Sequence, residues 1–407
     1  MKACEVKEVI LPTGATVILS EVPDARSVSM GIFVRSGAAH ELDEESGVSH
    51  FLEHLVFKGA SHDGIEVTEA MANIGAHINA YTTDEHTSFY ASCLPDVANE
   101  ALPLLLGLLE PRFSAKDVDV ERDVILEEMR QYRDDPSFVA HESALRFFAA
   151  GHPLTRSILG QEQTVKALSE RTIKRFFERR YLPQRIAVVV AGAIAGLDVL
   201  EPARRTTERL PQSHTSTVEP LVELVGRVGR NELSWPATST AHLLALWPGV
   251  SEHNIDKFAL ELWCDIVGAG ARLGWGVVEP GLVDSAGIAC ELRQSSGYVM
   301  LSASGDANSI VQSETEIGAL LDQLTSNPVT QDELLQSKSM TRFALDSTFE
   351  TPSDVMTAHG EHWLTHGEPY PLEREQALFG AVSLAEVNRF NERFRLSNAA
   401  VTILRPD

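Results

Sequence analysis

Two segments, one late in each half of the chain, repeat the same pattern. Arg175 to Val190 (RFFERRYLPQRIAVVV) and Arg389 to Leu404 (RFNERFRLSNAAVTIL) share Arg, Phe, Glu, Arg and Leu at the same places, 214 positions apart in a chain of 407 residues. Each has the pattern of a helix end, a short turn and a β-branched run typical of a buried strand. Because the offset is close to half the length, we predict two structurally related halves that arose by duplication.

The length and one polar stretch agree with this division. A chain of 407 residues is too long for one ordinary core and suggests two domains of about 200 residues. Residues 206–220 (TTERLPQSHTSTVEP) are polar, contain two prolines and show no amphipathic period, which predicts a linker. We therefore expect domains at 1–205 and 221–407.

Strand-like and helix-like runs occur in both halves without strict alternation. This favours an α+β fold with mainly antiparallel sheets over a doubly wound fold. The strand-like runs are 16–20, 27–34 and 241–246, and the helix-like runs are 118–132, 256–267 and 331–346.

Composition excludes several classes of protein. The chain is 43% hydrophobic and 23% charged, as expected for a globular protein, and its formal charge of −24 argues against nucleic acid as a partner. The four scattered cysteines form no CxxC pair and no secretory leader precedes them, so we expect free thiols in the cytoplasm. The most apolar run, 186–200, is interrupted and too short to cross a membrane.

The stretch Gly47 to Gly59 (GVSHFLEHLVFKG) is the main chemical motif. At 3.6 residues per turn, His50 and His54 lie one turn apart on one face, with Glu53 beside them and apolar residues at most other positions. Two imidazoles so placed can bind one metal ion, and the carboxylate is placed to accept a proton from water. His-x-x-Glu-His is the inverted form of the commoner zinc-peptidase motif.

A second helix supplies a carboxylate for the same site. In 118–132 (VDVERDVILEEMRQY), Glu121 and Glu128 are seven residues apart and share one side of the helical wheel. Val118, Val124, Ile125 and Tyr132 lie near them, whereas Asp123, Glu127 and Arg130 fall on the other side. Carboxylates on an apolar face are costly unless they are paired or bind a metal. We therefore predict that Glu128 is a metal ligand and that Glu127 is solvated.

Together these segments resemble the family that contains pitrilysin, insulin-degrading enzyme and the mitochondrial processing peptidases. The family pattern is His-x-x-Glu-His, a ligand glutamate some seventy residues later and another glutamate seven residues before it. Here Glu128 follows His54 by 74 positions and Glu121 precedes Glu128 by seven. The runs 75–90 (GAHINAYTTDEHTSFY) and 152–160 (HPLTRSILG) also match, as do the closing strands of both halves.

The resemblance implies a role for each matching residue. His50, His54 and Glu128 would bind one Zn²⁺ per chain, and Glu53 would be the general base. Glu121 would orient a ligand imidazole, and Asn79 with the backbone of Ala80 and Tyr81 would hold a peptide substrate as an added β-strand. The first domain would be the zinc-binding catalytic domain and the second a homologous domain without metal. The active form would be a clam-like chamber of four such domains.

One part of the family pattern is missing. Active members carry an arginine and a tyrosine in a segment resembling R-G-L-A-Y-S, which corresponds here to 280–285 (PGLVDS). Pro280 stands at the arginine position and Asp284 at the tyrosine position; Arg293 and Tyr298 lie outside the pattern. We therefore expect the zinc-bearing half of a heterodimer, whose homologous partner chain supplies both side chains.

Alternatives remain at this stage. His359, His362 and His366 (HGEHWLTH) have helical spacing, but without a buried acidic partner we interpret them as a partly exposed helix end. A non-catalytic structural subunit of a larger assembly is the main competing function, since the family contains such members. A thiol hydrolase using Cys93 is a further possibility, although no His with a plausible base role accompanies it.

Overall fold

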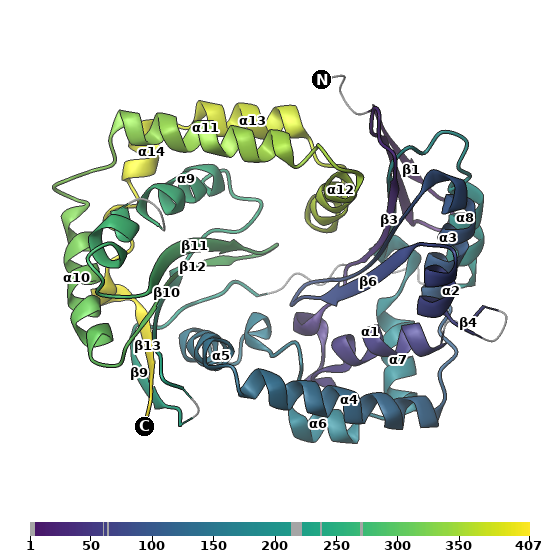
Figure 1. The fold of residues 1–407 in the computed structure, drawn as a ribbon, viewed down its shortest axis with the longest axis horizontal. Coiled ribbons are helices and arrows are strands. Elements are labelled where there is room, and N and C mark those ends of the chain that lie inside the picture. Colours follow the sequence, from purple (N-terminus) through teal and green to yellow (C-terminus); the bar gives the residue numbers. More distant parts are fainter. Residues whose placement is uncertain (1–4, 60, 63–64, 213–221, 237, 269–271) are drawn as a thin grey trace. The chain divides into compact units, whose positions relative to one another are not determined.

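The computed structural model describes residues 5–59, 61–62, 65–212, 222–236, 238–268 and 272–407. The chain forms two compact units, drawn in Figure 1. Unit 1 comprises residues 1–129, 156–219 and 346–370, and unit 2 comprises 130–155, 220–345 and 371–407. The units thus differ from the contiguous halves 1–205 and 221–407, because each half of the sequence contributes one internal segment to the other unit.

The sheet of unit 1 has six strands among the described residues, in the order β1-β2-β8-β3-β7-β6. Only β2 and β8 pair in parallel within this sheet, and the other described neighbours are antiparallel. Every residue of β3 and β8 is buried, which explains their continuous apolar sequences. The bounds are β1 Glu5–Ile10, β2 Thr16–Glu21, β3 Val28–Val34, β6 His77–Thr82, β7 Thr87–Cys93 and β8 Ile186–Gly192, with a separate small pair β4 Ser61–His62 and β5 Ile65–Glu66.

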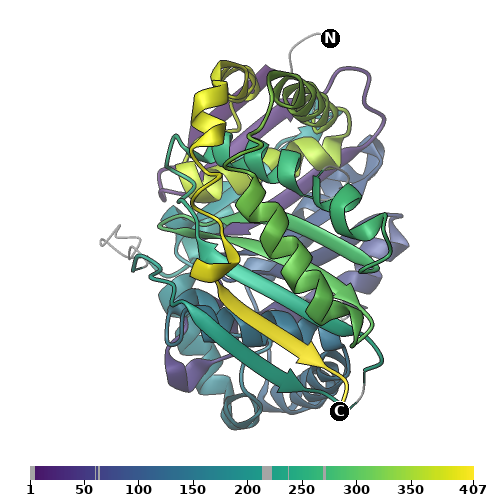
Figure 2. The same ribbon diagram turned by 90° about the vertical axis from the view of Figure 1, so that its left-hand side faces the viewer.

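The sheet of unit 2 repeats this topology. Its described strands have the order β11-β12-β10-β13-β9, and only β13 and β9 are parallel; β13 is the yellow strand beside β9 in Figure 2. Strands β9, β13, β10, β12 and β11 therefore correspond to β2, β8, β3, β7 and β6. The expectation of two related α+β domains with mainly antiparallel sheets is confirmed. The bounds are β9 Gly229–Ser234, β10 Ala241–Pro248, β11 Ser285–Leu292, β12 Gly297–Gly305 and β13 Ala400–Arg405.

The two repeated sequence segments occupy equivalent positions. In the first, helix α7 (Glu170–Arg180) is followed by a 3-10 turn that leads into β8. The short helix α14 (Leu384–Asn388) ends just before the second segment, which begins with turns; a 3-10 turn then leads into β13. Each of the two strands pairs with one parallel and one antiparallel neighbour.

One helix on each sheet comes from the other half of the sequence. Helix α12 packs on β3 and β8 of unit 1, and α5 packs on β10 and β13 of unit 2. The first contact requires Gly360, because a Cβ there would lie 2.2–2.4 Å from the ring of Phe33. The helices of unit 1 are α1 Val48–Gly59, α2 Val67–Asn73, α3 Ala98–Leu106, α4 Ala115–Arg133 (its last four residues grouped with unit 2), α6 Glu162–Ala167, α7 Glu170–Arg180, α8 Leu200–Arg209 and α12 Pro352–His366. Those of unit 2 are α5 Pro136–Phe148, α9 Lys257–Val267, α10 Ser309–Gln323, α11 Gln331–Ser347 (its last two residues grouped with unit 1), α13 Leu372–Ala381 and α14 Leu384–Asn388.

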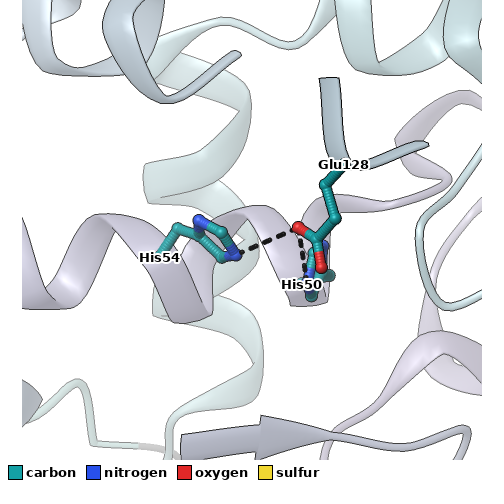
Figure 3. A group of neighbouring side chains, drawn as sticks. All are labelled: His50, His54 and Glu128. Atoms are coloured by element: carbon teal, nitrogen blue, oxygen red, sulfur yellow. Dashed lines mark ion pairs between the residues drawn. The ribbon is translucent and has the colours of Figure 1, made fainter. Parts of the chain in front are cut away.

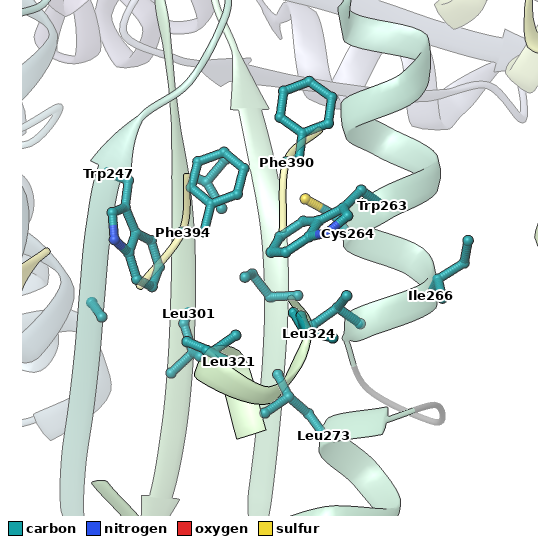
Figure 4. Close-up of a cluster of buried hydrophobic side chains, with 14 of the residues drawn as sticks. Trp247, Trp263, Cys264, Ile266, Leu273, Leu301, Leu321, Leu324, Phe390 and Phe394 are labelled. Atoms are coloured by element: carbon teal, nitrogen blue, oxygen red, sulfur yellow. The ribbon is translucent and has the colours of Figure 1, made fainter. Parts of the chain in front are cut away.

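Large aromatic side chains fill the core of unit 2 (Figure 4). Trp247 and Trp263 are fully buried and both contact Phe394, with ring centroids 5.8 and 4.9 Å apart. Their indole N–H groups donate to the Arg395 carbonyl and to the Asn391 side chain, both at 2.9 Å. The core therefore satisfies the polar end of each tryptophan.

The expectation of a linker at 206–220 needs both a correction and a restriction. The predicted linker 206–220 begins inside helix α8, because Thr206 and Thr207 are buried and continue its helical turns. The part of that linker from 213 to 220 lies outside the described residues. Among the residues that the structure describes, no helix has the length and apolar character needed to cross a membrane.

Candidate metal centre

Helix α1 starts at a tightly built turn. Gly47 has a φ of +92°, and a Cβ there would come within 2.9 Å of the Leu159 carbonyl, so glycine is required on both counts. The buried carboxylate of Glu41 accepts hydrogen bonds from the backbone N–H groups of Gly47 (2.7 Å) and Ser49 (2.8 Å). Burial raises the pKa of Glu41 to about 7 despite these bonds. The Glu41 carboxylate thus holds the start of α1 through its backbone N–H groups.

His50 and His54 project from α1 toward Glu128 of α4. Nε2 of His50 lies 3.7 Å from Oε2 of Glu128, and Nε2 of His54 lies 3.6 Å from the same oxygen (Figure 3). One ligand atom from each of the three side chains lies within 4.8 Å of the others. The structure therefore brings together the three predicted ligands.

The separations of both histidines from Glu128 are close to those around a tetrahedral metal ion. Ligand atoms at about 2.0–2.2 Å from zinc lie roughly 3.3–3.6 Å from one another, close to the two measured separations. Both separations between histidine nitrogen and glutamate oxygen are too long for direct hydrogen bonds. Burial, and secondarily the neighbouring His54, lowers the pKa of His50 to about 3, so its imidazole is neutral, as a ligand must be. Nitrogen and carboxylate oxygen are donors that zinc accepts.

Glu121 lies behind His54. Its Oε2 atom is 3.3 Å from Nδ1 of His54, and its other oxygen is 3.9 Å from Nζ of Lys58. The Glu121 side chain is only 5% exposed, and these two partners offset the cost of burying its charge. This is the contact expected of a carboxylate that fixes the orientation of a ligand imidazole. The corresponding ring nitrogen of His50, Nδ1, is buried and has no hydrogen-bond partner among the described residues.

The two adjacent glutamates of α4 differ in exposure as expected, but two residues predicted to lie near the buried side of this helix are exposed. Glu127 is exposed and Glu128 is half-buried beside the histidines. Val124, placed near the buried side of the wheel by sequence, is 47% exposed, and Tyr132 is 42% exposed. The buried stripe contains Val118, Glu121, Ile125, Leu126 and Met129 and is narrower than the predicted one.

Glu53 is held by a residue that sequence reasoning missed. The hydroxyl of Thr82 donates to Oε2 of Glu53 at 2.5 Å. Burial raises the pKa of Glu53, while the Thr82 hydrogen bond acts in the opposite direction. The sequence offered only an indirect indication of this contact, because Thr82 directly follows the edge-strand residues 79–81. Its spacing of 29 residues from Glu53 corresponds to no recognisable motif.

Strand β6, which carries Asn79, Ala80 and Tyr81, is the last strand in the order of its sheet. It pairs with β7 on one side, and α1 packs nearby. The N–H of Ala80 donates to the side-chain oxygen of Asn79 at 2.8 Å. The Tyr81 hydroxyl donates to Glu361 of α12 at 2.9 Å. The predicted substrate positions therefore lie on an edge strand of the described sheet, and the Ala80 N–H is bonded to the neighbouring Asn79 side chain.

The other candidate groups do not form a second centre among the described residues. His359 and His362 are buried in α12 rather than partly exposed, because α12 packs on the sheet of unit 1. Burial lowers the pKa of His359 to about 4 and raises that of Cys93 to about 11. A thiol with so high a pKa is a poor nucleophile at neutral pH. Cys93, Cys264 and Cys290 are free thiols.

The site and fold together define a two-domain α+β protein with a His–His–Glu donor set in its first unit. Residues 16–162 match the family described as insulinase (Peptidase family M16), and residues 167–341 match its second domain, described as the Peptidase M16 inactive domain. The chain therefore belongs to peptidase family M16.

Curated relatives and solved structures agree with this assignment. An uncharacterized zinc protease of Bacillus subtilis, YmxG, is 26% identical over 98% of both chains. The probable mitochondrial-processing peptidase subunit beta of Arabidopsis thaliana is 31% identical over 53% of this chain and 41% of its own length. The crystal structure of a protease from Helicobacter pylori has a TM-score of 0.90 at 20% identity, covering 99% of this chain and all of that chain, and thus supports the fold.

Proposed function

We propose that this chain is a zinc-dependent endopeptidase that cleaves peptides or unfolded polypeptides. The observation that carries this proposal is the convergence of His50, His54 and Glu128, with Glu53 beside them on the same helix. A zinc ion bound there would supply Lewis-acid chemistry, polarising a peptide carbonyl and making water more acidic. The names of the relatives as zinc proteases support the same reading.

The residues of the chain would perform the proton transfers. Glu53, half-buried and held through Oε2 by Thr82, would accept a proton from the attacking water and pass it to the leaving amine. Glu121 would keep His54 in the tautomer that presents Nε2 to the metal. A peptide added to the free edge of β6 would reach the backbone of Ala80 once the Asn79 side chain releases its N–H.

The second part of the proposal is that a homologous partner chain completes the site. In unit 2, Pro280 and Asp284 are exposed at the positions where arginine and tyrosine are expected. The nearest substitutes are engaged: Tyr298 is buried, and Arg293 bonds Glu291 at 3.1 Å and lies over the Tyr298 ring. Two such chains would form the clam-like chamber. The naming of the Arabidopsis relative as a subunit supports an assembly, and the free thiols fit a cytoplasmic location.

Glu53→Gln tests this function. The three ligands remain, so the variant should bind zinc like the parent, while hydrolysis of an unstructured peptide by the chain with its partner falls by about 10²–10⁴-fold. Glu44→Gln, at an exposed position outside the site, is the matched control. Equal activity of parent and Glu53→Gln would refute the role of Glu53. A non-catalytic subunit would show no zinc-dependent hydrolysis in the parent itself.

A further inference from the structure

Among the described residues, the Thr82 hydroxyl lies near two possible acceptors, Glu53 and Thr87, at different distances. Thr82 ends β6 and pairs with Thr87 of β7, whose own hydroxyl donates to the buried carbonyl of Ser36 at 2.9 Å. The proton of Thr82 can therefore go to Oε2 of Glu53 at 2.5 Å or to Oγ1 of Thr87 at 3.4 Å. Each hydroxyl has a single proton, and the shorter bond to a carboxylate is the stronger. Thr82 is thus a donor to Glu53.

This bond engages Oε2 of Glu53. A free glutamate samples several rotamers about three side-chain bonds, and a hydrogen bond from a sheet residue restricts them. The β6–β7 pairing fixes Thr82 through its partner Thr87. General bases act only when they are held close to the productive geometry.

The same strand carries both the donor and the predicted substrate edge. Asn79, Ala80 and Tyr81 precede Thr82 directly in β6. Along a strand each residue advances about 3.3 Å. The same strand would therefore fix the positions of a peptide paired with residues 79–81 and of the carboxylate held by Thr82. Thr82 contacts Glu53 through its side chain, whereas a peptide would pair with the strand through residues 79–81. A change of the Thr82 side chain would therefore alter the position of the base without altering the peptide-binding edge.

We propose that Thr82 is the positioning residue of Glu53, orienting its carboxylate relative to a peptide bound along β6. The inference rests on the proposed peptidase function, but its structural part does not. Thr82 acts through Glu53 and need not touch the substrate. It should therefore affect turnover rather than zinc or peptide binding.

The kinetic test compares Thr82→Val with Thr82→Ser in the full chain, loaded with zinc and mixed with its homologous partner. Valine keeps the shape and removes the hydroxyl, so kcat should fall about 10–100-fold, typical of partners one layer removed from the reacting groups, with KM and zinc content unchanged. Serine should restore kcat to within a few-fold. Thr207→Val, at a buried threonine of α8, is the control and should leave kcat unchanged.

Crystal structures of the parent, Thr82→Val and Thr82→Ser provide a readout that does not depend on activity. In the parent and the serine variant we expect the Glu53 carboxylate to accept a hydrogen bond from the hydroxyl of residue 82. In the valine variant we expect that carboxylate to be displaced or to occupy several rotamers. An unmoved carboxylate in Thr82→Val, an unchanged kcat, or a loss of zinc would each overturn the inference. If Glu53→Gln is as active as the parent, the proposed role of Glu53 as general base fails instead, and the crystal structures alone decide whether Thr82 positions its carboxylate.

Discussion

Oε2 of Glu121 lies 3.3 Å from Nδ1 of His54, while Nε2 of the same imidazole lies 3.6 Å from Oε2 of Glu128. Two carboxylates seven residues apart on α4 therefore contact the two nitrogens of one ring. Because their surroundings differ, with side-chain exposures of 5% for Glu121 and 29% for Glu128, the two glutamates are expected to act differently.

Substitutions on α4 should separate these roles. Glu128→Gln removes the proposed anionic ligand and should weaken zinc binding far more than Glu121→Gln, whose effect we expect at roughly 10–100-fold. Glu127→Gln changes an exposed side chain and should leave zinc affinity within a few-fold of the parent. Competition with a chromogenic chelator measures all three. Similar losses at 127 and 128 would contradict the assignment.

Packing of α12 on the unit 1 sheet should depend on Gly360. Alanine there would place its Cβ within 2.4 Å of the buried Phe33 ring, so Gly360→Ala should destabilise unit 1 by about 1–3 kcal/mol. Gly107→Ala is the control in the same unit, since its backbone is helical and a Cβ would meet nothing within 4 Å. Urea midpoints followed by circular dichroism compare the two. Equal midpoints would mean that α12 is not held against Phe33 in solution.

The sequence contained enough information to predict both helices of the site. Periodic apolar residues in 48–59 and 118–132 determine which faces are buried, and this distinguishes Glu128 from Glu127. Val124 was placed wrongly because a helical wheel shows the direction of the buried face, whereas the width of that face depends on which elements pack against the helix. Thr82 could not be predicted, since a threonine at a strand end has no local signature for a partner on another element.

The exchange of helices between units also escaped prediction. The sequences of α5 and α12 indicate amphipathic helices, but an apolar face does not say which sheet buries it. Duplication predicted two similar units correctly, yet it led to the expectation of contiguous domains. The repeated segments 175–190 and 389–404, in contrast, were found because the turn and the strand that follow each helix are local in sequence.

Unit 2 should lose stability as pH rises through neutrality because of Glu261. Burial, and secondarily the charge of Glu252, raises the pKa of Glu261 from its ordinary value of 4.5 to about 8. The folded state then binds more protons than the unfolded state between those values, so the free energy of unfolding falls as pH rises from 4.5 to 8. Glu261→Gln should flatten this dependence and be the more stable protein at pH 8.

Urea midpoints at pH 5, 6.5 and 8 measure that effect. Glu316→Gln on α10 replaces an exposed glutamate and serves as the control, with a pH profile like that of the parent. If the profiles of Glu261→Gln and the parent run parallel, Glu261 does not titrate in this range.

The isolated chain should be a poor peptidase even when fully loaded with zinc. Missing donors to a developing oxyanion typically cost about 10²–10³-fold in kcat, and Pro280 and Asp284 cannot donate to it. Mixing with a homologous chain that carries the arginine and tyrosine should restore hydrolysis, and the same partner with both residues replaced should not. High activity of this chain alone would contradict the division of labour.

The most direct measurement is the zinc content of the purified chain and of His50→Ala. Elemental analysis should give one zinc per parent chain, because His50, His54 and Glu128 converge on one point, and close to none after the substitution. His253→Ala, at an exposed histidine of unit 2, should retain one zinc. A parent without zinc after incubation with the metal, or a His50→Ala variant that keeps its full equivalent, would contradict the account.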